Sequence, residues 1–220
     1  MVIASQARRV EYPPLSAPEM STMTDTNPRQ AEYPVDPLFL NRWSPRAFTG
    51  ESVPEKDLLT ILDAARWAPS AFNSQPWRFV YGVKGTPAFD KLLGLLNDFN
   101  QSWAKNSGAI VIVLSKTHLL PPGAAEEVPS YSHTLDAGAA WGSAALQATL
   151  LGYSAHGATG IHLDKVHETL DVPEGYRAEL AFVVGKRGDK SILPEGLAAR
   201  EVPSPRKPLA EIAFEGSFKG

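Results

Sequence analysis

The sequence predicts an α+β fold in which a small central sheet is wrapped by helices. Helical and strand-like segments are mixed along the 220 residues without the regular alternation of a parallel βαβ sheet. The segment 109–114 is apolar and β-branched, as in a buried strand, and 132–151 is the longest helical segment. Alanines and leucines lie around most of that helix, so we expect it to be buried centrally or in a subunit interface.

Residues 1–34 are predicted to form a flexible arm or one that drapes over a partner. They are polar, contain prolines and lack sustained periodicity. No internal repeat and no separating linker follows, so 35–220 is predicted to be a single domain. Prolines recur through the last thirty-odd residues and predict an extended C-terminal arm.

The helix starts and stops give the remaining elements. Ser52, Pro54 and Glu55 stand in capping-box register and predict a helix start, and Pro69 stops that helix after Trp67. The other predicted segments are helices at 35–43, 87–96 and 164–170, strands at 78–83 and 177–185, a polar segment at 97–106, a loop at 119–129 and a glycine-rich turn or strand at 152–160.

The composition excludes several classes of function. The net charge of -3 and the scattered basic residues argue against binding nucleic acid by bulk charge. The absence of cysteine excludes disulfides and thiolate catalysis. The longest apolar run is far shorter than a membrane span, and the N-terminus does not look like a secretory signal. We therefore expect a cytoplasmic protein with neither nucleic acid nor membrane as a partner.

The loop 69–77 separates the helix from the strand that follows it. A proline near each end prevents helix or sheet from running through it. Ser70, Asn73, Ser74 and Gln75 can all donate and accept hydrogen bonds, which suits a flat ring rich in heteroatoms. The alternative is a polar loop that hydrogen-bonds to itself.

Basic residues offer candidate anion sites. Arg42 and Arg46 flank Ser44 two residues away on each side, so an irregular turn could aim both guanidiniums at one phosphate. The alternative is a pair of surface salt bridges. Arg206 and Lys207 form a second basic pair, which by itself predicts only a solvated surface.

Other catalytic motifs are weak or absent. Ser154 and His156 lie in a segment that resembles a nucleophile elbow, but its spacing is one residue too long. A small hydrolase therefore stays only as an unfavoured alternative. The five histidines show no H-E-x-x-H arrangement, and the chain has neither a G-x-G-x-x-G nor a Walker loop.

Six motifs in order resemble the nitroreductase family of FMN oxidoreductases. They cover most of the chain from about residue 38 to 214. The matching segments are similar to the family patterns R-x-S-x-R/K-x-F at 42–48, A-P-S-x-x-N-x-Q-P-W at 68–77, N-Q-x-W at 100–103, D-x-G at 136–138, L-x-x-P-E-G-Y at 170–176 and R-K-P-L at 206–209.

The resemblance implies a mostly antiparallel sheet and an intertwined homodimer with FMN in each of two interface clefts. It implies ping-pong hydride transfer from NADH or NADPH to a nitroaromatic, quinone or similar small molecule. Such chemistry resides in the flavin and needs neither a protein nucleophile nor a metal. A flavin-binding or flavin-consuming member of the same superfamily, without general reductase activity, is the main alternative.

The resemblance also implies which residues bind the cofactor. The first motif is expected at the phosphate, the ribityl chain or the pyrimidine edge, with Arg46 a candidate to stabilise the reduced flavin. The proline-flanked loop would line the flavin and the partner side of the cleft. The implied residues are Arg42, Trp43, Ser44 and Arg46; Pro69, Ser70, Ala71 and Asn73; Asn100 at the pyrimidine; Ala158, Thr159 and Gly160 at the N5 edge; and Arg206 with Lys207 at the phosphate.

Two departures from the family pattern stand out. Ala158-Thr159-Gly160 occupies the place of the usual Gly-Gly pair, which bears on the shape of the substrate face. Ser143 stands in the central helix where the family commonly has asparagine, which concerns support of the site.

Overall fold

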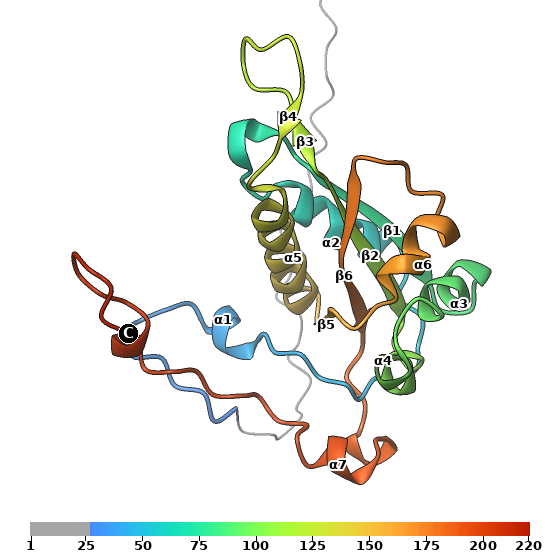
Figure 1. Cartoon of the computed structure of the whole chain (residues 1–220). Helices are drawn as coiled ribbons and strands as arrows, with labels where there is room; N and C mark the ends of the chain where they lie inside the picture. Colours follow the sequence, from blue (N-terminus) through green and yellow to red (C-terminus); the bar gives the residue numbers. More distant parts are fainter. Residues whose placement is uncertain (1–26) are drawn as a thin grey trace, which may run out of the picture.

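The computed structural model describes residues 27–220 and confirms the α+β class (Figure 1). Its helices are α1 (Pro37–Asn41), α2 (Glu55–Arg66), α3 (Pro87–Leu93), α4 (Asp98–Ala104), α5 (His133–Leu150), α6 (Leu163–Thr169) and α7 (Glu195–Ala198), with 3₁₀ turns η1 (Ala71–Asn73), η2 (Lys190–Ile192) and η3 (Leu209–Glu211). Its strands are β1 (Trp77–Val83), β2 (Ala109–Lys116), β3 (His118–Leu119), β4 (Val128–Pro129), β5 (Ser154–Ala158) and β6 (Tyr176–Gly185).

The main sheet has the order β1-β2-β6-β5, and every neighbouring pair is antiparallel. The register pairs Trp77 with Ser115 at one end of β1 and Val83 with Ala109 at the other. A β-bulge interrupts the β2–β6 ladder between Val113 and Leu114. The register therefore defines two ends of the sheet, one at the pair Trp77–Ser115 and the other at the pair Val83–Ala109.

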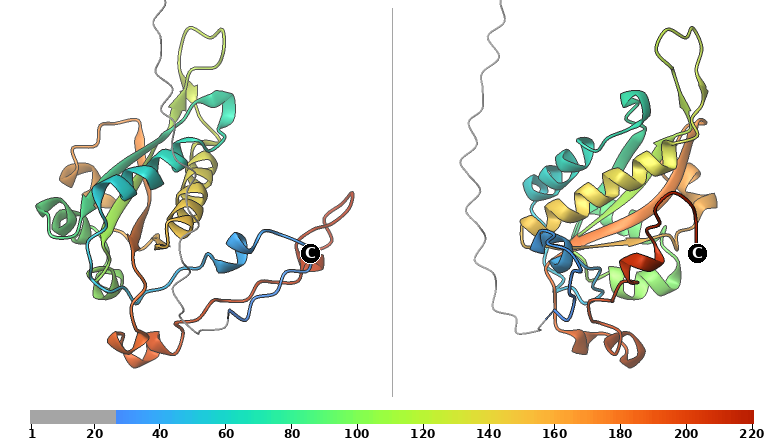
Figure 2. Two further views of the ribbon diagram at one scale, coloured as in Figure 1. Left: turned by 180° about the vertical axis from the view of Figure 1, so that it is seen from behind. Right: turned by 90° about the vertical axis from the view of Figure 1, so that its left-hand side faces the viewer.

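Helices cover both faces of the sheet, and the side-chain alternation of β2 shows which core each face builds. Val111 and Val113 pack with α2 and α5, whereas Ile110 and Ile112 pack with α3, α4 and α6. The buried side chains of α5 are mainly alanines, so the helix approaches the sheet closely. The predicted burial of this helix is therefore confirmed. Figure 2 shows α2 and α5 side by side over the sheet.

Four local predictions need correction. The segment 97–106 contains α4, because the Asn97 side chain accepts a hydrogen bond from the Asn100 N–H and caps the helix. The predicted loop 119–129 is framed by the short β3–β4 pairing. Ser52 does not cap α2, whose first flanking residue is Pro54. The C-terminal arm contains η2 and α7 before it extends.

The arms project away from the body of the molecule (Figure 2). Glu32 accepts a hydrogen bond from the Leu209 N–H at 2.8 Å and so ties residues near the N-terminal side of α1 to the C-terminal arm. Most of the predicted flexible arm, residues 1–26, lies outside the described residues. Within residues 27–220, no helix combines the length and apolar character needed to cross a membrane.

Candidate functional site

Two arginines that lie far apart in the sequence approach each other at one end of the sheet. Arg42 follows α1 and donates to the Ser44 hydroxyl at 3.4 Å, and Arg206 lies on the C-terminal arm and donates to Ser204 Oγ at 3.2 Å. Within residues 27–220, no carboxylate lies within ion-pair distance of either guanidinium. Burial, followed by repulsion from Arg206, lowers the pKa of Arg42. The pair is therefore an uncompensated positive centre suited to an anion.

Arg46 belongs to the same turn but faces a different set of groups. Glu201 Oε1 accepts hydrogen bonds from the backbone N–H groups of Arg46 and Ala47 at 2.6 and 2.7 Å. The guanidinium carbon lies 6.0 Å from the centre of the Trp103 ring. The buried Arg46 Nε has no hydrogen-bond partner among the described residues. Burial and then repulsion from Arg200 lower the pKa of Arg46, while Glu201 opposes the shift.

His156 supports this turn from β5. Its Nδ1 lies 2.9 Å from the carbonyl oxygen of Pro45, and its ring lies 4.5 Å from that of Trp103. Burial is the main reason that its pKa falls to about 4, so the ring is neutral at pH 7 and Nδ1–H donates to the carbonyl. The unfavoured hydrolase alternative finds no support here, because no hydrogen bond joins Ser154 to His156 in the described chain.

Asn100 meets the segment that follows β5. Its side-chain amide donates to the Gly160 carbonyl at 3.0 Å, and the residue is only 8% exposed. A Cβ atom at Gly160 would lie 2.5 Å from the amide nitrogens of both Asn97 and Asn100, so a larger residue there would force both side chains to move. In residues 27–220, neither the Thr159 nor the Gly160 N–H donates to another backbone carbonyl. These donors stand available beside the Asn100 amide.

The loop 69–77 is held in a strained conformation. Phe72, Asn73 and Gln75 have φ angles of 52°, 53° and 47°, in the left-handed region that side chains disfavour. Ser70 Oγ accepts from the Gln75 N–H at 3.0 Å, so the self-bonded loop that the sequence left open is observed in part. The prolines therefore act together with this hydroxyl in shaping the loop.

A buried carboxylate fixes the loop to α5. Asp136 Oδ2 accepts from the Ala71 N–H at 3.3 Å and from the Ser132 hydroxyl at 3.0 Å. The Asn73 side chain makes no hydrogen bond in the described chain and stays exposed. The network rigidifies the backbone while leaving polar side chains on the surface.

The structure brings only some of the predicted residues together. The turn that carries Arg42, Ser44 and Arg46 lies just beyond the end of the sheet marked by Val83 and Gly185, where the Gly188 N–H donates to the Ala47 carbonyl, and Arg206 lies near Arg42. Asn100 and Gly160 meet farther along β5, beyond the pair Ala158–Ala181, and Trp103 of the same helix as Asn100 lies beside Arg46. Pro69, Ser70, Ala71 and Asn73 precede Trp77 at the opposite end of the sheet. Figure 1 shows the η1 turn beside the β3–β4 hairpin, with α4 and α7 at the other end. One chain therefore carries two separate half-sites, which we call the basic end and the loop end.

Two predicted residues make other contacts. The Trp43 ring lies 5.9 Å from the Arg187 guanidinium carbon, and Lys207 is exposed on the wall of a pocket of about 640 Å³ between the arms. Sequence reasoning missed His156 as a support and missed Glu201 altogether. Glu201 is 155 residues from Arg46 and stands in no quoted motif, so no local signal could have found it.

Comparison with known proteins places these features in a family. The model of the Nitroreductase family matches residues 40–84, which include the arginine turn and the proline-flanked loop. A solved structure described as an oxidoreductase containing FMN is 56% identical, covers 90% of this chain and 100% of its own, and superposes with a TM-score of 0.85. A nitroreductase from Desulfovibrio desulfuricans, solved in complex with FMN, is 25% identical over 86% of this chain and 100% of its own, with a TM-score of 0.63.

A curated relative agrees with the solved structures over a shorter region. A Rhodopseudomonas palustris protein provisionally named NADH dehydrogenase/NAD(P)H nitroreductase is 33% identical over 90 residues. That match spans 40% of this chain and 45% of the relative, less than half of its length. The motif order, the shared fold and the near-complete overlap with the 56% identical structure agree. The chain belongs to the nitroreductase family.

Proposed function

We propose that this protein is an FMN-dependent oxidoreductase that uses NADH or NADPH to reduce nitroaromatic, quinone or similar electron-poor small molecules. One observation carries the proposal: Arg42 and Arg206 form a positive centre that no carboxylate of residues 27–220 compensates, and unpaired donors such as Arg46 Nε belong to the same turn. A phosphate dianion compensates such a centre, and each guanidinium can bind it through two hydrogen bonds.

The donors at the basic end fit the rest of a flavin nucleotide. Ser44 supplies a hydroxyl beside the arginines, and the orphan Nε of Arg46 offers a buried charged donor. The free N–H groups of Thr159 and Gly160 suit a ring nitrogen such as N5. The Asn100 amide, already oriented by Gly160, suits the polar pyrimidine edge. These groups would hold FMN by its phosphate and by both polar edges of its ring.

Bound FMN supplies the hydride chemistry, and the protein sets the orientation and the electrostatics. Arg46 would face the part of the ring on which negative charge develops upon reduction. Its backbone is fixed by Glu201 and by the turn that His156 supports, so little reorganisation accompanies the charge change. We propose a ping-pong cycle, in which the nicotinamide leaves before the acceptor occupies the same face.

The separation of the half-sites supports assembly as a homodimer. The loop end of one chain cannot reach its own basic end along the sheet, but the loop end of a second copy could complete it. On the projecting arms, the side chains of Tyr33, Phe39 and Ile212 are 65%, 57% and 60% exposed to solvent. An apolar surface of this kind is usually covered by another molecule. A second copy that packed against the arms would bury this surface.

The purified protein tests the proposal directly. We expect a yellow preparation with a flavin band near roughly 450 nm, which bleaches when NADH or NADPH is added under anaerobic conditions. A nitroaromatic or quinone should restore the band and support steady-state turnover. A colourless protein that does not bind added FMN would overturn the proposal. A yellow protein that neither nicotinamide reduces would instead favour a flavin-binding member without general reductase activity.

Arg46→Ala tests the electrostatic part of the proposal. Loss of a charge-assisted contact of roughly 1.5–3 kcal/mol should slow flavin reduction by about ten- to hundredfold or weaken FMN binding to a similar degree. Stopped-flow bleaching and FMN titration measure the two effects. Arg66→Ala is the matched control, because Arg66 is exposed on α2 and, among the described residues, contacts only Asp63 and the neighbouring Trp67 ring. Unchanged reduction and unchanged affinity in Arg46→Ala would exclude the role.

A further inference from the structure

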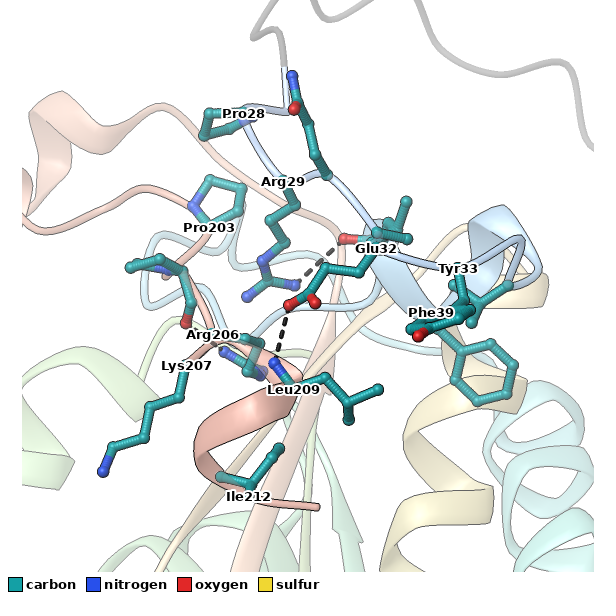
Figure 3. Close-up of a pocket in the computed structure, with 15 residues that line it drawn as sticks. Pro28, Arg29, Glu32, Tyr33, Phe39, Pro203, Arg206, Lys207, Leu209 and Ile212 are labelled. Carbon is teal, nitrogen blue, oxygen red and sulfur yellow. Dashed lines mark hydrogen bonds between the residues drawn. The ribbon is translucent and has the colours of Figure 1, made fainter. Parts of the chain in front are cut away.

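A third arginine, Arg29, crosslinks the two segments that carry the basic end. It precedes α1 and belongs to no motif of the sequence. Its side chain lies between the N-terminal segment and the C-terminal arm (Figure 3). Its Nη1 donates to the carbonyl oxygens of Arg42 and Leu40 at 2.8 and 3.1 Å. Its Nε donates to the carbonyl oxygen of Ser204 at 2.8 Å. One side chain thus joins the Arg42 turn to the C-terminal arm.

The crosslink also gathers positive charge. Arg29 and Arg206 both donate to Ser204 Oγ, at 3.4 and 3.2 Å, which places their guanidiniums on one hydroxyl. Burial, followed by repulsion from Arg206 and Arg42, lowers the pKa of Arg29. Within residues 27–220, no carboxylate lies within ion-pair distance of Arg29. Three like charges are therefore held together with no anion supplied by the described chain.

Such an arrangement costs energy unless a ligand compensates it. Like charges repel at short range, and each guanidinium also loses hydration as it is partly buried. A neutral amide could bind two of these three carbonyl oxygens without adding a third positive charge. Arginine at this position both makes the crosslink and raises the positive potential at Arg42 and Arg206.

We infer that Arg29 is a positioning residue of the phosphate site, which holds Arg42 and Arg206 at one phosphate and adds its own charge there. The inference rests on the proposed FMN function and extends the cofactor site into the segment before α1. The ligand group is the phosphate monoester of the flavin nucleotide. Riboflavin, which has the same ring without phosphate, should not depend on Arg29.

The test compares FMN with riboflavin. The full-length protein is stripped of flavin, and both ligands are titrated by flavin fluorescence into wild type, Arg29→Gln and Arg29→Lys. We expect Arg29→Gln to weaken FMN binding by about ten- to hundredfold and to leave riboflavin binding unchanged. Arg29→Lys, which keeps the charge but has a single donor head, should recover part of the loss. The salt dependence of FMN binding should be shallower in Arg29→Gln than in wild type.

Arg66→Gln serves as the matched control, because Arg66 is exposed and remote from the arms. A double variant with Arg206→Gln should lose less FMN affinity than the two single losses multiplied, since Arg29 acts partly through Arg206. Equal loss of FMN and riboflavin affinity, or a large fall in the melting temperature of the flavin-free protein, would reduce Arg29 to a structural brace and overturn the inference. Unchanged FMN affinity would overturn it as well. Wild-type protein that binds neither ligand would overturn the proposed function, and the inference with it.

Discussion

His156 gives the basic end a pH dependence that can be measured as stability. Its pKa is about 4 in the folded chain, mainly because of burial, against 6.5 for the ordinary side chain. Between these values the unfolded chain binds more protons than the native one, so the free energy of unfolding rises with pH across this window. The stability that neutral His156 provides is fully present above pH 6.5 and is lost as the pH falls toward 4. The whole difference is about 3 kcal/mol.

Denaturant unfolding at pH 7 and pH 4.5 measures this effect. His156→Phe keeps a ring against Trp103 but cannot titrate, so its loss of stability between the two pH values should be smaller than that of wild type by about 2–3 kcal/mol. His167→Phe is the control, because that histidine lies on α6, away from the arginine turn. An identical pH dependence in wild type and His156→Phe would contradict the assigned neutral state.

Residues in short, regular patterns were predictable, and residues joined across the chain were not. The spacing of Arg42, Ser44 and Arg46 predicted an anion site because three polar groups stand within five residues. In the structure the two arginines have different neighbours, since Arg42 lies near Arg206 and Arg46 lies over the Trp103 ring. Arg29 escaped prediction because its partners are carbonyl oxygens, which leave no trace in the sequence.

The loop 69–77 shows how neighbouring groups can hold an element in a strained conformation. Three residues with positive φ persist because neighbouring groups hold the backbone, and Asp136 supplies one of these restraints from α5. Asp136→Ala should lower the free energy of unfolding by about 1–3 kcal/mol, since it leaves the Ala71 N–H without its acceptor. The same change should weaken FMN binding if the loop lines the cofactor.

Asp136→Asn separates the restraint from the charge, because the amide oxygen can still accept from the Ala71 N–H. We expect it to retain more FMN affinity than Asp136→Ala. Ser132→Ala is the second control, since it removes the hydroxyl partner and leaves the Ala71 contact intact. Melting curves and FMN titration on the same preparations check both effects. Full FMN affinity in a destabilised Asp136→Ala protein would show that the loop does not contribute to binding the cofactor.

Element prediction succeeded where one signal dominated. The uninterrupted apolar run gave β2, because a strand buried on both faces needs no polar alternation. Helix α4 was missed because its three buried positions, Asn100, Trp103 and Ala104, are too few to show a period, and its Asn97 cap is equally typical of turns. The capping box predicted at Ser52 is not formed, because the residue that flanks α2 is Pro54 and the helix begins at Glu55.

At the scale of the molecule, the distance between the half-sites is the most consequential feature. Strand β1 runs between them, with Trp77 toward the loop end and Val83 toward the basic end. The motifs predicted both half-sites and the resemblance implied a cleft between two chains, but linear order alone could not show that the folded chain keeps the two half-sites apart. Under the proposed function, a complete site would need two chains, with the basic end from one and the loop end from its partner.

Subunit mixing provides a direct test of this shared site. Arg42→Ala damages only the basic end, and Asn73→Ala damages only the exposed loop side chain, so each homodimer should be weakly active. In a mixed dimer, one site combines both defects and the other combines the intact basic end with the intact loop. Random reassociation should therefore restore about one quarter of the wild-type sites.

Turnover is measured after unfolding and refolding equal amounts of the two variants together. The two variants refolded separately and then mixed are the control. No recovery in refolded mixtures that contain mixed dimers would show that both half-sites act within one chain, because then neither subunit could supply a complete set.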